Sequence, residues 1–308
     1  MKRFLGIDLG GTNIKFSVLE VDKATLKEIE KGQVPTEADH GPLHVTNRIA
    51  DIVKRLNLEL EIDSVALAVP GIFDHDSGNI LLFPNLPGNW NQFPLVDKLK
   101  EWTQKEISLI NDARAFCLAE STLGAGRGHR FIACIVLGTG VGGGLVIDGK
   151  VHEGTTKGAG EIAHQVVAPD GPVCGCGTRG CLEALTSSAA ISALAGTESP
   201  EQAYSQAIEG DARAISAFRE VGRWLGIGLA NVNAVFSPSI FIVGGGVAQA
   251  GNLLLDFIRQ ELHERNNLWP NSNFEVVPAQ LSFFAGATGA ALKAAAVAGT
   301  QLSFTSIT

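Results

Sequence analysis

The sequence predicts an α/β fold in which helices cover a mostly parallel β-sheet. Short apolar runs alternate with helical patterns, and a strand–glycine turn–strand unit occurs twice, at residues 4–20 and 131–148. The 308 residues suffice for roughly two domains of about 150 residues each. The repeated unit therefore indicates two related halves.

The first half alternates between the two kinds of element. In chain order we expect strands at 3–8 and 14–20, a helix at 44–57, a strand at 64–69, a helix at 94–105, a strand at 107–110 and a helix at 113–123. Ile49, Val53 and Leu56 share one face of the first helix. Pro94 suits the first turn of the second helix, and Asn111-Asp112 end the strand before the third.

The second half repeats this alternation. In chain order we expect strands at 131–137, 145–147 and 150–152, a helix ending at Gly210, a helix at 212–236, a strand at 239–243, a helix around 254–262 and a helix at 289–298. Asp148-Gly149 is typical of a hairpin turn. Ser199-Pro200-Glu201-Gln202 is a capping box that begins a helix, and Pro238 ends the long helix.

Composition excludes several classes of protein. The chain has 24 Lys plus Arg against 32 Asp plus Glu, a net charge of −8, so we expect no nucleic-acid partner. No apolar run reaches the roughly 18 residues of a transmembrane helix, so we expect no membrane partner. The apolar run of the N-terminus stops at Asp8, unlike a signal peptide. Five cysteines, an odd number, favour reduced thiols and a cytoplasmic location.

The segment from Asp8 to Lys15 is a candidate phosphate-binding turn. Gly10-Gly11 exposes backbone N–H groups, Thr12 supplies a hydroxyl and Lys15 a positive charge. Asp8 is suited to holding a metal ion through water. The alternative is a plain hairpin turn.

A second glycine run spans residues 138–144. Gly138, Gly140 and Gly143 match G-x-G-x-x-G after a predicted strand, which raises the hypothesis of a dinucleotide-binding oxidoreductase. That motif requires a helix next, whereas residues 145–149 read as a strand and a turn. A second phosphate-binding hairpin, with Thr139 as hydroxyl donor, fits better.

His164, Cys174, Cys176 and Cys181 form a candidate metal site. One His and three Cys make a closed tetrahedral set, which suits structural zinc and leaves no open position. C-x-C is not the commonest zinc spacing, and the alternative is reduced thiols beside an unrelated His.

Three carboxylates are candidate site residues. Asp112 stands where a strand ends and a helix begins, which is where ligands bind in open α/β sheets; its alternative role is a helix cap. Glu161 and Glu183 lie beside the cysteine loop, which would hold both carboxylates rigidly if zinc bound there. Each glutamate alone would be a solvated surface charge.

Together these residues resemble the ROK family of repressors, open-reading-frame proteins and kinases, whose fold is similar to those of actin, Hsp70 and the hexokinases. The resemblance covers essentially the whole chain and rests on Asp8–Thr12, Leu137–Gly144, Gly160–His164, Cys174–Glu183, Ile242–Gly246 and Ala285–Ala291. Ala163 departs from the family, which usually has Gly before the His.

The resemblance implies an ATP-dependent sugar kinase with two actin-like (ribonuclease H-like) domains and a cleft between them. We expect a smaller domain at 1–112, to which a C-terminal helix at about 290–308 returns. A larger domain at 113–289 carries the zinc loop. ATP, Mg²⁺, a structural Zn²⁺, a hexose and a homodimer are implied with it.

The resemblance also assigns residues to roles. Asp112 is expected to be the general base. The sugar-contact positions are Gly71, Asn111, Asp112, Glu161, His164 and Glu183. The ATP-binding positions are Asp8, Gly10, Gly11, Thr12, Lys15, Gly138, Thr139, Gly140, Gly244, Gly245 and Gly246. The zinc ligands are His164, Cys174, Cys176 and Cys181.

Glucose is the expected sugar, because the segment Phe83–Trp90 looks like a glucokinase-type loop. Asn89 separates Gly88 from Trp90, which family members usually have adjacent, so N-acetylglucosamine, mannose and fructose stay open. Repressors of the family carry a helix-turn-helix domain before the first phosphate motif, for which the residues before Asp8 leave no room. A sugar-sensing regulator without catalysis is the remaining alternative.

Overall fold

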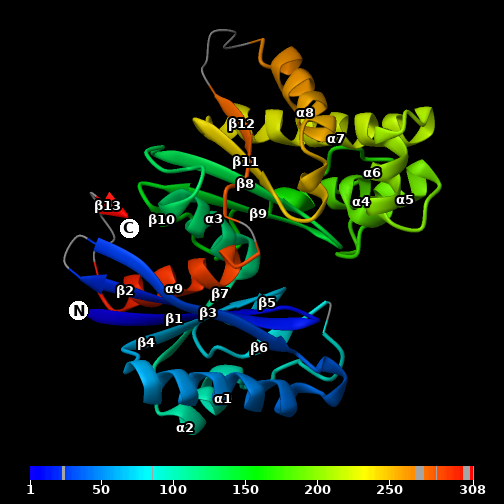
Figure 1. The fold of residues 1–308 in the computed structure, drawn as a ribbon. Coiled ribbons are helices and arrows are strands. Elements are labelled where there is room, and N and C mark those ends of the chain that lie inside the picture. Colours follow the sequence, from blue (N-terminus) through cyan, green and yellow to red (C-terminus); the bar gives the residue numbers. More distant parts are fainter. Residues whose placement is uncertain (23–24, 85, 268–273, 282, 301–305, 308) are drawn as a thin grey trace. The chain divides into compact units, whose positions relative to one another are not determined.

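The computed structural model describes residues 1–22, 25–84, 86–267, 274–281, 283–300 and 306–307. The chain forms two compact units, one of residues 1–123 with 281–308 and one of residues 124–280. Each unit holds a mixed β-sheet with its own apolar core (Figure 1).

The sheet of the first unit has the strand order β13-β3-β2-β1-β4-β7. Its strands are β1 (Lys2–Leu9), β2 (Asn13–Asp22), β3 (Thr25–Pro35), β4 (Ser64–Val69), β7 (Ile107–Asn111) and β13 (Ser306–Ile307). β1, β4 and β7 are parallel, whereas β2 runs antiparallel to β1 and to β3. The carboxyl ends of the three parallel strands therefore meet at one edge of the sheet, and the residues that follow them lie together.

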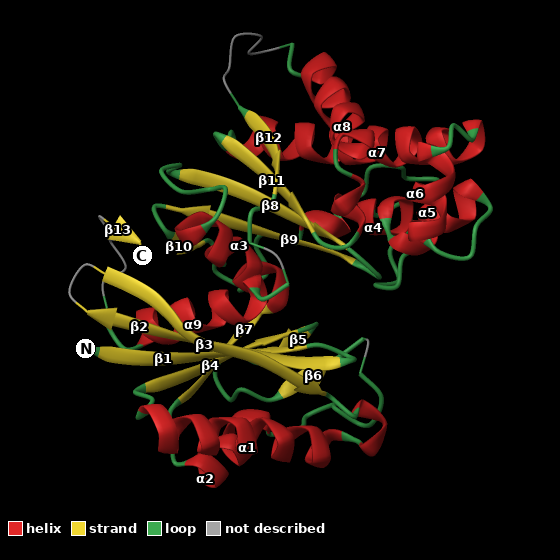
Figure 2. Cartoon of the chain, viewed as in Figure 1, coloured by secondary structure: helices red, strands yellow, loops and turns green. Residues whose placement is uncertain are grey.

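Helices cover both faces of this sheet (Figure 2). α1 (Pro42–Leu60) and α2 (Leu95–Thr103) lie on one face, and α9 (Ala285–Val297) lies on the other with α3 (Asp112–Leu123) beside it. Gly6 of β1 and Gly289 permit this packing, since a Cβ at either would overlap backbone atoms of Ala287 or Ala115. The predicted boundary at Asp112 differs from the division into units, because α3 packs against α9 and stays with the first unit.

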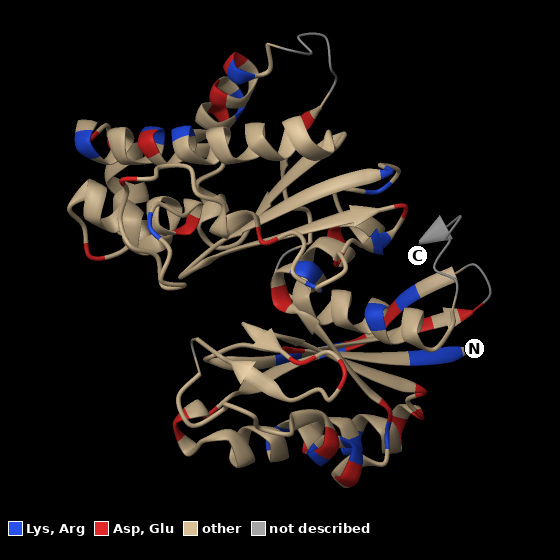
Figure 3. Cartoon of the chain, turned by 180° about the vertical axis from the view of Figure 1, so that it is seen from behind, with Lys and Arg blue, Asp and Glu red and all other residues tan. Residues whose placement is uncertain are grey.

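The sheet of the second unit has the order β10-β9-β8-β11-β12. Its strands are β8 (Phe131–Leu137), β9 (Val141–Ile147), β10 (Lys150–Val151), β11 (Ile240–Gly244) and β12 (Glu275–Pro278). Its helices are α4 (Leu182–Thr186), α5 (Ser188–Ala195), α6 (Pro200–Ile208), α7 (Ala212–Phe236) and α8 (Asn252–Arg265). β8, β9 and β11 carry no charged residue, whereas charged residues of both signs lie on the first half of α7 and on α8 (Figure 3).

The remaining elements are short. β5 (Ile72–Phe73) and β6 (Ile80–Leu82) form a two-stranded sheet, and η1 (Ala38–His40), η2 (Ile162–His164) and η3 (Val247–Ala250) are 3₁₀-helices. No helix within the described ranges has both the length and the apolar character needed to cross a membrane.

The internal repeat extends from one hairpin to a whole sheet. The order β3-β2-β1-β4-β7 of the first unit matches β10-β9-β8-β11-β12 of the second, strand for strand. In each, a hairpin's first strand pairs in parallel with a strand that arrives much later in the sequence. Two α/β units of matching topology confirm the predicted fold class.

Several elements differ from expectation. The short elements β5, β6, β12, β13, α4 and α5 have no predicted counterpart. β3 was not predicted, because its charged and half-exposed residues lack an apolar alternation. Residues 141–144 form the start of β9 rather than a loop, and a Cβ at Gly143 would lie 2.8 Å from the carbonyl oxygen of Gly160. α9 begins at Ala285 and ends at Val297. Of the predicted C-terminal helix beyond it, Ser306–Ile307 form strand β13 instead, and residues 301–305 and 308 lie outside the described residues.

Candidate functional site

The first glycine turn joins β1 to β2, and Thr36, which follows β3, forms two hydrogen bonds to its backbone. The N–H of Gly10 donates to the carbonyl of Asn13 at 3.1 Å. Thr36 is fully buried; its hydroxyl donates to the carbonyl of Gly10 at 2.6 Å and its N–H to the carbonyl of Thr12 at 2.8 Å. Gly11 and Thr12 are exposed at the tip. The turn thus presents two residues to solvent on a fixed base.

An ion pair stands at the foot of this turn. The Nζ of Lys15 lies 3.6 Å from Oδ2 of Asp8, with the side chains 19% and 16% exposed. Lys15 also lies 4.0 Å from the ring centroid of Phe283, and the carboxyl of Asp8 lies against Gly286 in the first turn of α9. Burial raises the pKa of Asp8 above its ordinary value, although Lys15 opposes the shift. The carboxylate of Asp8 offers oxygen ligands that suit a hydrated divalent cation.

Asn111 is the last residue of β7, and Asp112 is the first residue of α3. Oδ1 of Asn111 accepts hydrogen bonds from the N–H groups of Ala113 at 3.1 Å and Arg114 at 3.3 Å, which is the geometry of a helix cap. Oδ1 of Asp112 accepts from the N–H of the adjacent Ala113 at 2.7 Å. The capping role that the sequence left open for Asp112 therefore falls mainly to Asn111, which sequence reasoning had assigned only to the sugar.

Gly71 lies after β4 at the same sheet edge. Its φ is +84°, and a Cβ there would overlap the carbonyl oxygen of Leu82 and lie 2.8 Å from Pro84. Only glycine fits this backbone. In the sheet, Asp8 pairs with Ala68 and Val69 pairs with Asn111, so Asp8, Gly71 and Asn111 end three neighbouring strands.

The second glycine turn joins β8 to β9. The N–H of Gly138 donates to the carbonyl of Gly140 at 2.9 Å. The carbonyl of Gly138 accepts both the hydroxyl of Ser188, at 2.7 Å, and its N–H, at 3.0 Å. Thr139 is exposed at the tip. A residue distant in sequence thus fastens this turn as Thr36 fastens the first.

The third glycine segment, Gly244–Gly246, follows β11 and lies beside the second turn. Gly245 has a φ of +89°, and a Cβ on it would overlap the backbone oxygen of Leu137, the last residue of β8. A Cβ on Gly246 would meet nothing within 4 Å. Because β8 and β11 are parallel neighbours, the two turns lie at one edge of the second sheet.

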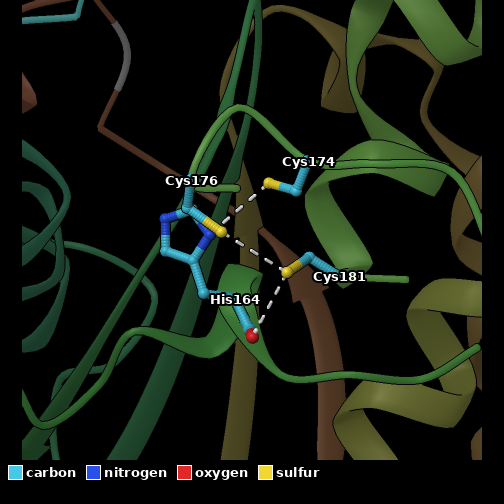
Figure 4. A group of neighbouring side chains, drawn as sticks. All are labelled: His164, Cys174, Cys176 and Cys181. Carbon is cyan, nitrogen blue, oxygen red and sulfur yellow. Dashed lines mark hydrogen bonds between the residues drawn. The ribbon is translucent and has the colours of Figure 1, made fainter. Parts of the chain in front are cut away.

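The predicted zinc ligands converge. The ligand atoms of His164, Cys174, Cys176 and Cys181 all lie within 4.8 Å of one another (Figure 4). Sγ of Cys174 lies 3.8 Å from Nδ1 of His164, and the Sγ atoms of Cys176 and Cys181 lie 3.7 Å apart. Tetrahedral zinc with Zn–S bonds of about 2.3 Å separates two sulfurs by about 3.8 Å, so the four residues fit this ion.

The thiols of this cluster differ in acidity without a metal. Burial raises the pKa of Cys174 to about 12. Hydrogen bonds from Thr178 lower the pKa of the exposed Cys176 to about 6. A divalent cation deprotonates a coordinating thiol outright, so these differences belong to the metal-free loop.

Glu183 connects the cysteine loop to the second glycine turn. It stands in the first turn of α4, directly after Cys181 and Leu182. Its Oε2 accepts the N–H of Val141 at 2.9 Å, and its Oε1 accepts the thiol of Cys174 at 3.2 Å. Sequence reasoning placed Glu183 only among the sugar contacts, since a bond across 42 residues leaves no local signal. Glu161 precedes η2 and is exposed.

Matching sheets with a glycine turn after the first strand of each define a two-domain α/β protein of the actin-like class. The sequence profile described as the ROK family matches residues 4–296. The chain belongs to the ROK family.

Two glucokinases align over nearly the whole chain, and a repressor aligns over part of it. The glucokinase of Thermotoga maritima is 36% identical over 94% of this chain and 96% of its own length. The glucokinase of Streptomyces coelicolor is 33% identical over 93% and 96%. The xylose repressor of Bacillus subtilis is 28% identical over 73% of this chain and 59% of the repressor.

Two solved structures share the fold. The ROK hexokinase of Thermus thermophilus superposes with a TM-score of 0.84 at 32% identity, covering 96% of this chain and 99% of that one. The ROK glucokinase of Streptomyces griseus, solved with glucose and AMPPNP, gives a TM-score of 0.77 at 32% identity over 95% and 99%.

Proposed function

We propose that this protein transfers the γ-phosphoryl group of ATP to the primary hydroxyl of glucose, forming glucose 6-phosphate. The observation that carries the proposal is that candidate phosphate-binding and catalytic residues meet at one edge of the first sheet. Asp8 lies at the carboxyl end of β1, the Gly10–Thr12 turn follows β1, and Asp112 follows β7 at that edge. Glucokinases similar to the chain over more than nine-tenths of its length support the same reaction.

Asp112 acts as the general base. It lies in the first turn of α3, where the helix dipole attracts negative charge, and it accepts the proton of the attacking hydroxyl. Backbone N–H groups and the hydroxyls of Thr12 and Thr139 hold the phosphates. Mg²⁺, when bound through water to Asp8, supplies charge neutralisation for the in-line transfer.

Hexose recognition is assigned, on the family resemblance, to Gly71, Asn111, Asp112, Glu161, His164 and Glu183. The two imidazole nitrogens of His164 allow one to bind a metal while the other faces the sugar. Relatives named N-acetylgalactosamine kinase, 30% identical, and N-acetylmannosamine kinase, 33% identical, keep N-acetylated hexoses as alternatives.

An ADP-release assay with ATP, Mg²⁺ and a panel of hexoses tests the proposal. We expect the highest kcat/KM for glucose. A higher kcat/KM for N-acetylglucosamine, mannose or fructose would show that glucose is not the preferred substrate, while the proposal of a hexose kinase would stand. Sugar binding without ADP release would favour a sugar-sensing regulator instead.

Zinc is proposed as a structural ion held by His164, Cys174, Cys176 and Cys181. The donor set and the 3.7 Å sulfur separation support this assignment. With four protein ligands, the ion has no position for substrate and contributes folding free energy instead of chemistry.

A homodimer in the cytoplasm is proposed on the family resemblance. Sedimentation equilibrium should give twice the chain mass of 32.4 kDa. A mass equal to that of one chain would contradict the dimer.

A further inference from the structure

Each of the two glycine turns accepts a hydrogen bond from a hydroxyl group of a distant segment: Thr36 for the first turn and Ser188 for the second. We propose that Thr36 and Ser188 are positioning residues for the phosphates of ATP. Thr36 lies 26 residues from Gly10, and Ser188 lies 50 residues from Gly138. The inference rests on the proposed phosphate-binding role of the two turns. Thr36 is fully buried, so it acts through the turn and not on a ligand.

The two fastenings share one geometry. The hydroxyl of Thr36 donates to the carbonyl of Gly10 at 2.6 Å, and the hydroxyl of Ser188 to the carbonyl of Gly138 at 2.7 Å. In each case the acceptor is the first glycine of the turn, and the residue after it is exposed. Two units that share a sheet topology thus hold equivalent carbonyls with unrelated segments.

Peptide geometry explains what this bond does. In a planar trans peptide the C=O and the following N–H point in opposite directions. Holding the carbonyl of Gly10 inward therefore directs the N–H of Gly11 outward, and holding that of Gly138 directs the N–H of Thr139 outward. Among the described residues, neither N–H donates to a protein acceptor. Each turn keeps a donor for an anion and keeps its carbonyl oxygen, which would repel an anion, turned away.

Loss of the hydroxyl should release this peptide. The carbonyl of Gly10 would lose its donor in a buried place, so a rotated peptide that reaches water becomes favourable. Rotation would turn the carbonyl toward the phosphates and misplace the N–H. Positioning errors of about 1 Å can lower turnover by roughly 10²-fold.

Thr36→Val tests the first turn, because valine keeps the shape and removes the donor. We expect KM for ATP to rise and kcat/KM for ATP to fall by roughly 10- to 100-fold, with KM for glucose within about twofold of wild type. Thr36→Ser should restore the hydroxyl and most of the ATP kinetics.

Thr46→Val is the matched control. Thr46 is also fully buried in the first unit, and its hydroxyl also donates to a backbone carbonyl, that of Pro42, at 2.7 Å. The control should lose a similar amount of thermal stability while its ATP kinetics stay those of wild type. If Thr36→Val matches Thr46→Val in both readouts, Thr36 is only structural and the proposal is wrong.

Ser188→Ala tests the second turn, with Ser121→Ala as control. Ser121 is half-buried like Ser188 and donates to the carbonyl of Leu118 at 2.8 Å. The N–H of Ser188 still bonds Gly138 in the variant, so we expect a smaller rise in KM for ATP than for Thr36→Val. An ATP KM equal to that of Ser121→Ala would remove Ser188 from the proposal.

Thr12→Ala separates this inference from the proposed function. It deletes the exposed hydroxyl of the first turn and leaves the bond from Thr36. If Thr12→Ala raises KM for ATP and Thr36→Val does not, the turn binds phosphate but Thr36 does not position it. If both variants keep wild-type ATP kinetics while glucose is phosphorylated, the turn is not the phosphate site and both ideas are wrong.

Discussion

The two units share a sheet topology but obtain their candidate site residues in different ways. In the first unit, Asp8 and Asn111 lie at the carboxyl ends of the parallel strands β1 and β7, and Gly71 lies just after β4. In the second unit, Glu161, His164 and Glu183 come from the segment between β10 and α5, which forms no part of the sheet. The shared sheet therefore places a glycine turn in both units, whereas Asp112 and the cysteine loop are each specific to one unit.

The difference extends to how each site is held. The first unit relies on strand pairing, a helix cap and the pair of Asp8 with Lys15. The second relies on Glu183, which bonds the N–H of Val141 and the thiol of Cys174. We therefore expect substitution of Asp112 in the first unit to change activity with little effect on folding, and substitutions in the cysteine loop of the second unit to change both.

The largest expected effect is that of Asp112→Asn. Because Asn111 caps α3, the variant should keep the melting temperature of wild type. Turnover at saturating glucose and ATP should fall by at least roughly 10²-fold, the usual worth of a general base. A variant that keeps more than about a tenth of wild-type turnover would show that Asp112 is not the base.

The next effect is that of Cys176→Ser, which should lower both folded yield and activity. Removing one of four ligands weakens a metal ion whose binding is coupled to folding. Metal analysis of tag-free wild-type protein should find one zinc per chain. Val173→Ser, at an exposed position of the same loop, is the control and should change neither metal content nor yield. Wild-type protein that is folded and metal-free would contradict the assignment.

A smaller, purely structural effect separates two adjacent glycines of the second unit. Gly245→Ala combines a left-handed φ with overlap on Leu137, so the free energy of unfolding should fall by at least about 2 kcal/mol. Gly246→Ala places its methyl group in open space and should leave the free energy of unfolding unchanged. Denaturant titration of both variants measures the difference, and equal stabilities would mean that β8 and β11 do not approach as described.

The smallest expected effect is a gain in stability from Asp8→Asn. Burial raises the pKa of Asp8, so ionised Asp8 disfavours the folded state, and the stability of wild type falls as pH rises through that pKa. The variant should therefore melt above wild type at pH 7, and the gap should close below the usual carboxyl pKa of 3.8. A variant less stable than wild type at pH 7 would mean that the attraction of Lys15 outweighs burial.

Local sequence patterns predicted much of the fold and part of the candidate site. The strand before Asn111-Asp112 and the helix after it were readable from apolar runs, and the cysteine spacing predicted the ligands that converge in the structure. Thr36 could not be found this way, because β3 alternates charged residues without an apolar face. Neither could the bond from Val141 to Glu183, which depends on how α4 packs beside β9.

The proposed mechanism gives neighbouring residues two separate tasks, because Asn111 caps α3 while Asp112 would accept the proton of the sugar hydroxyl. A single carboxylate with both tasks could not be replaced without weakening the start of the helix. In the proposed mechanism, one base change in the codon of Asp112 would abolish turnover and leave the cap of α3 in place. An enzyme built in this way would be one substitution away from a protein that folds and no longer phosphorylates its sugar.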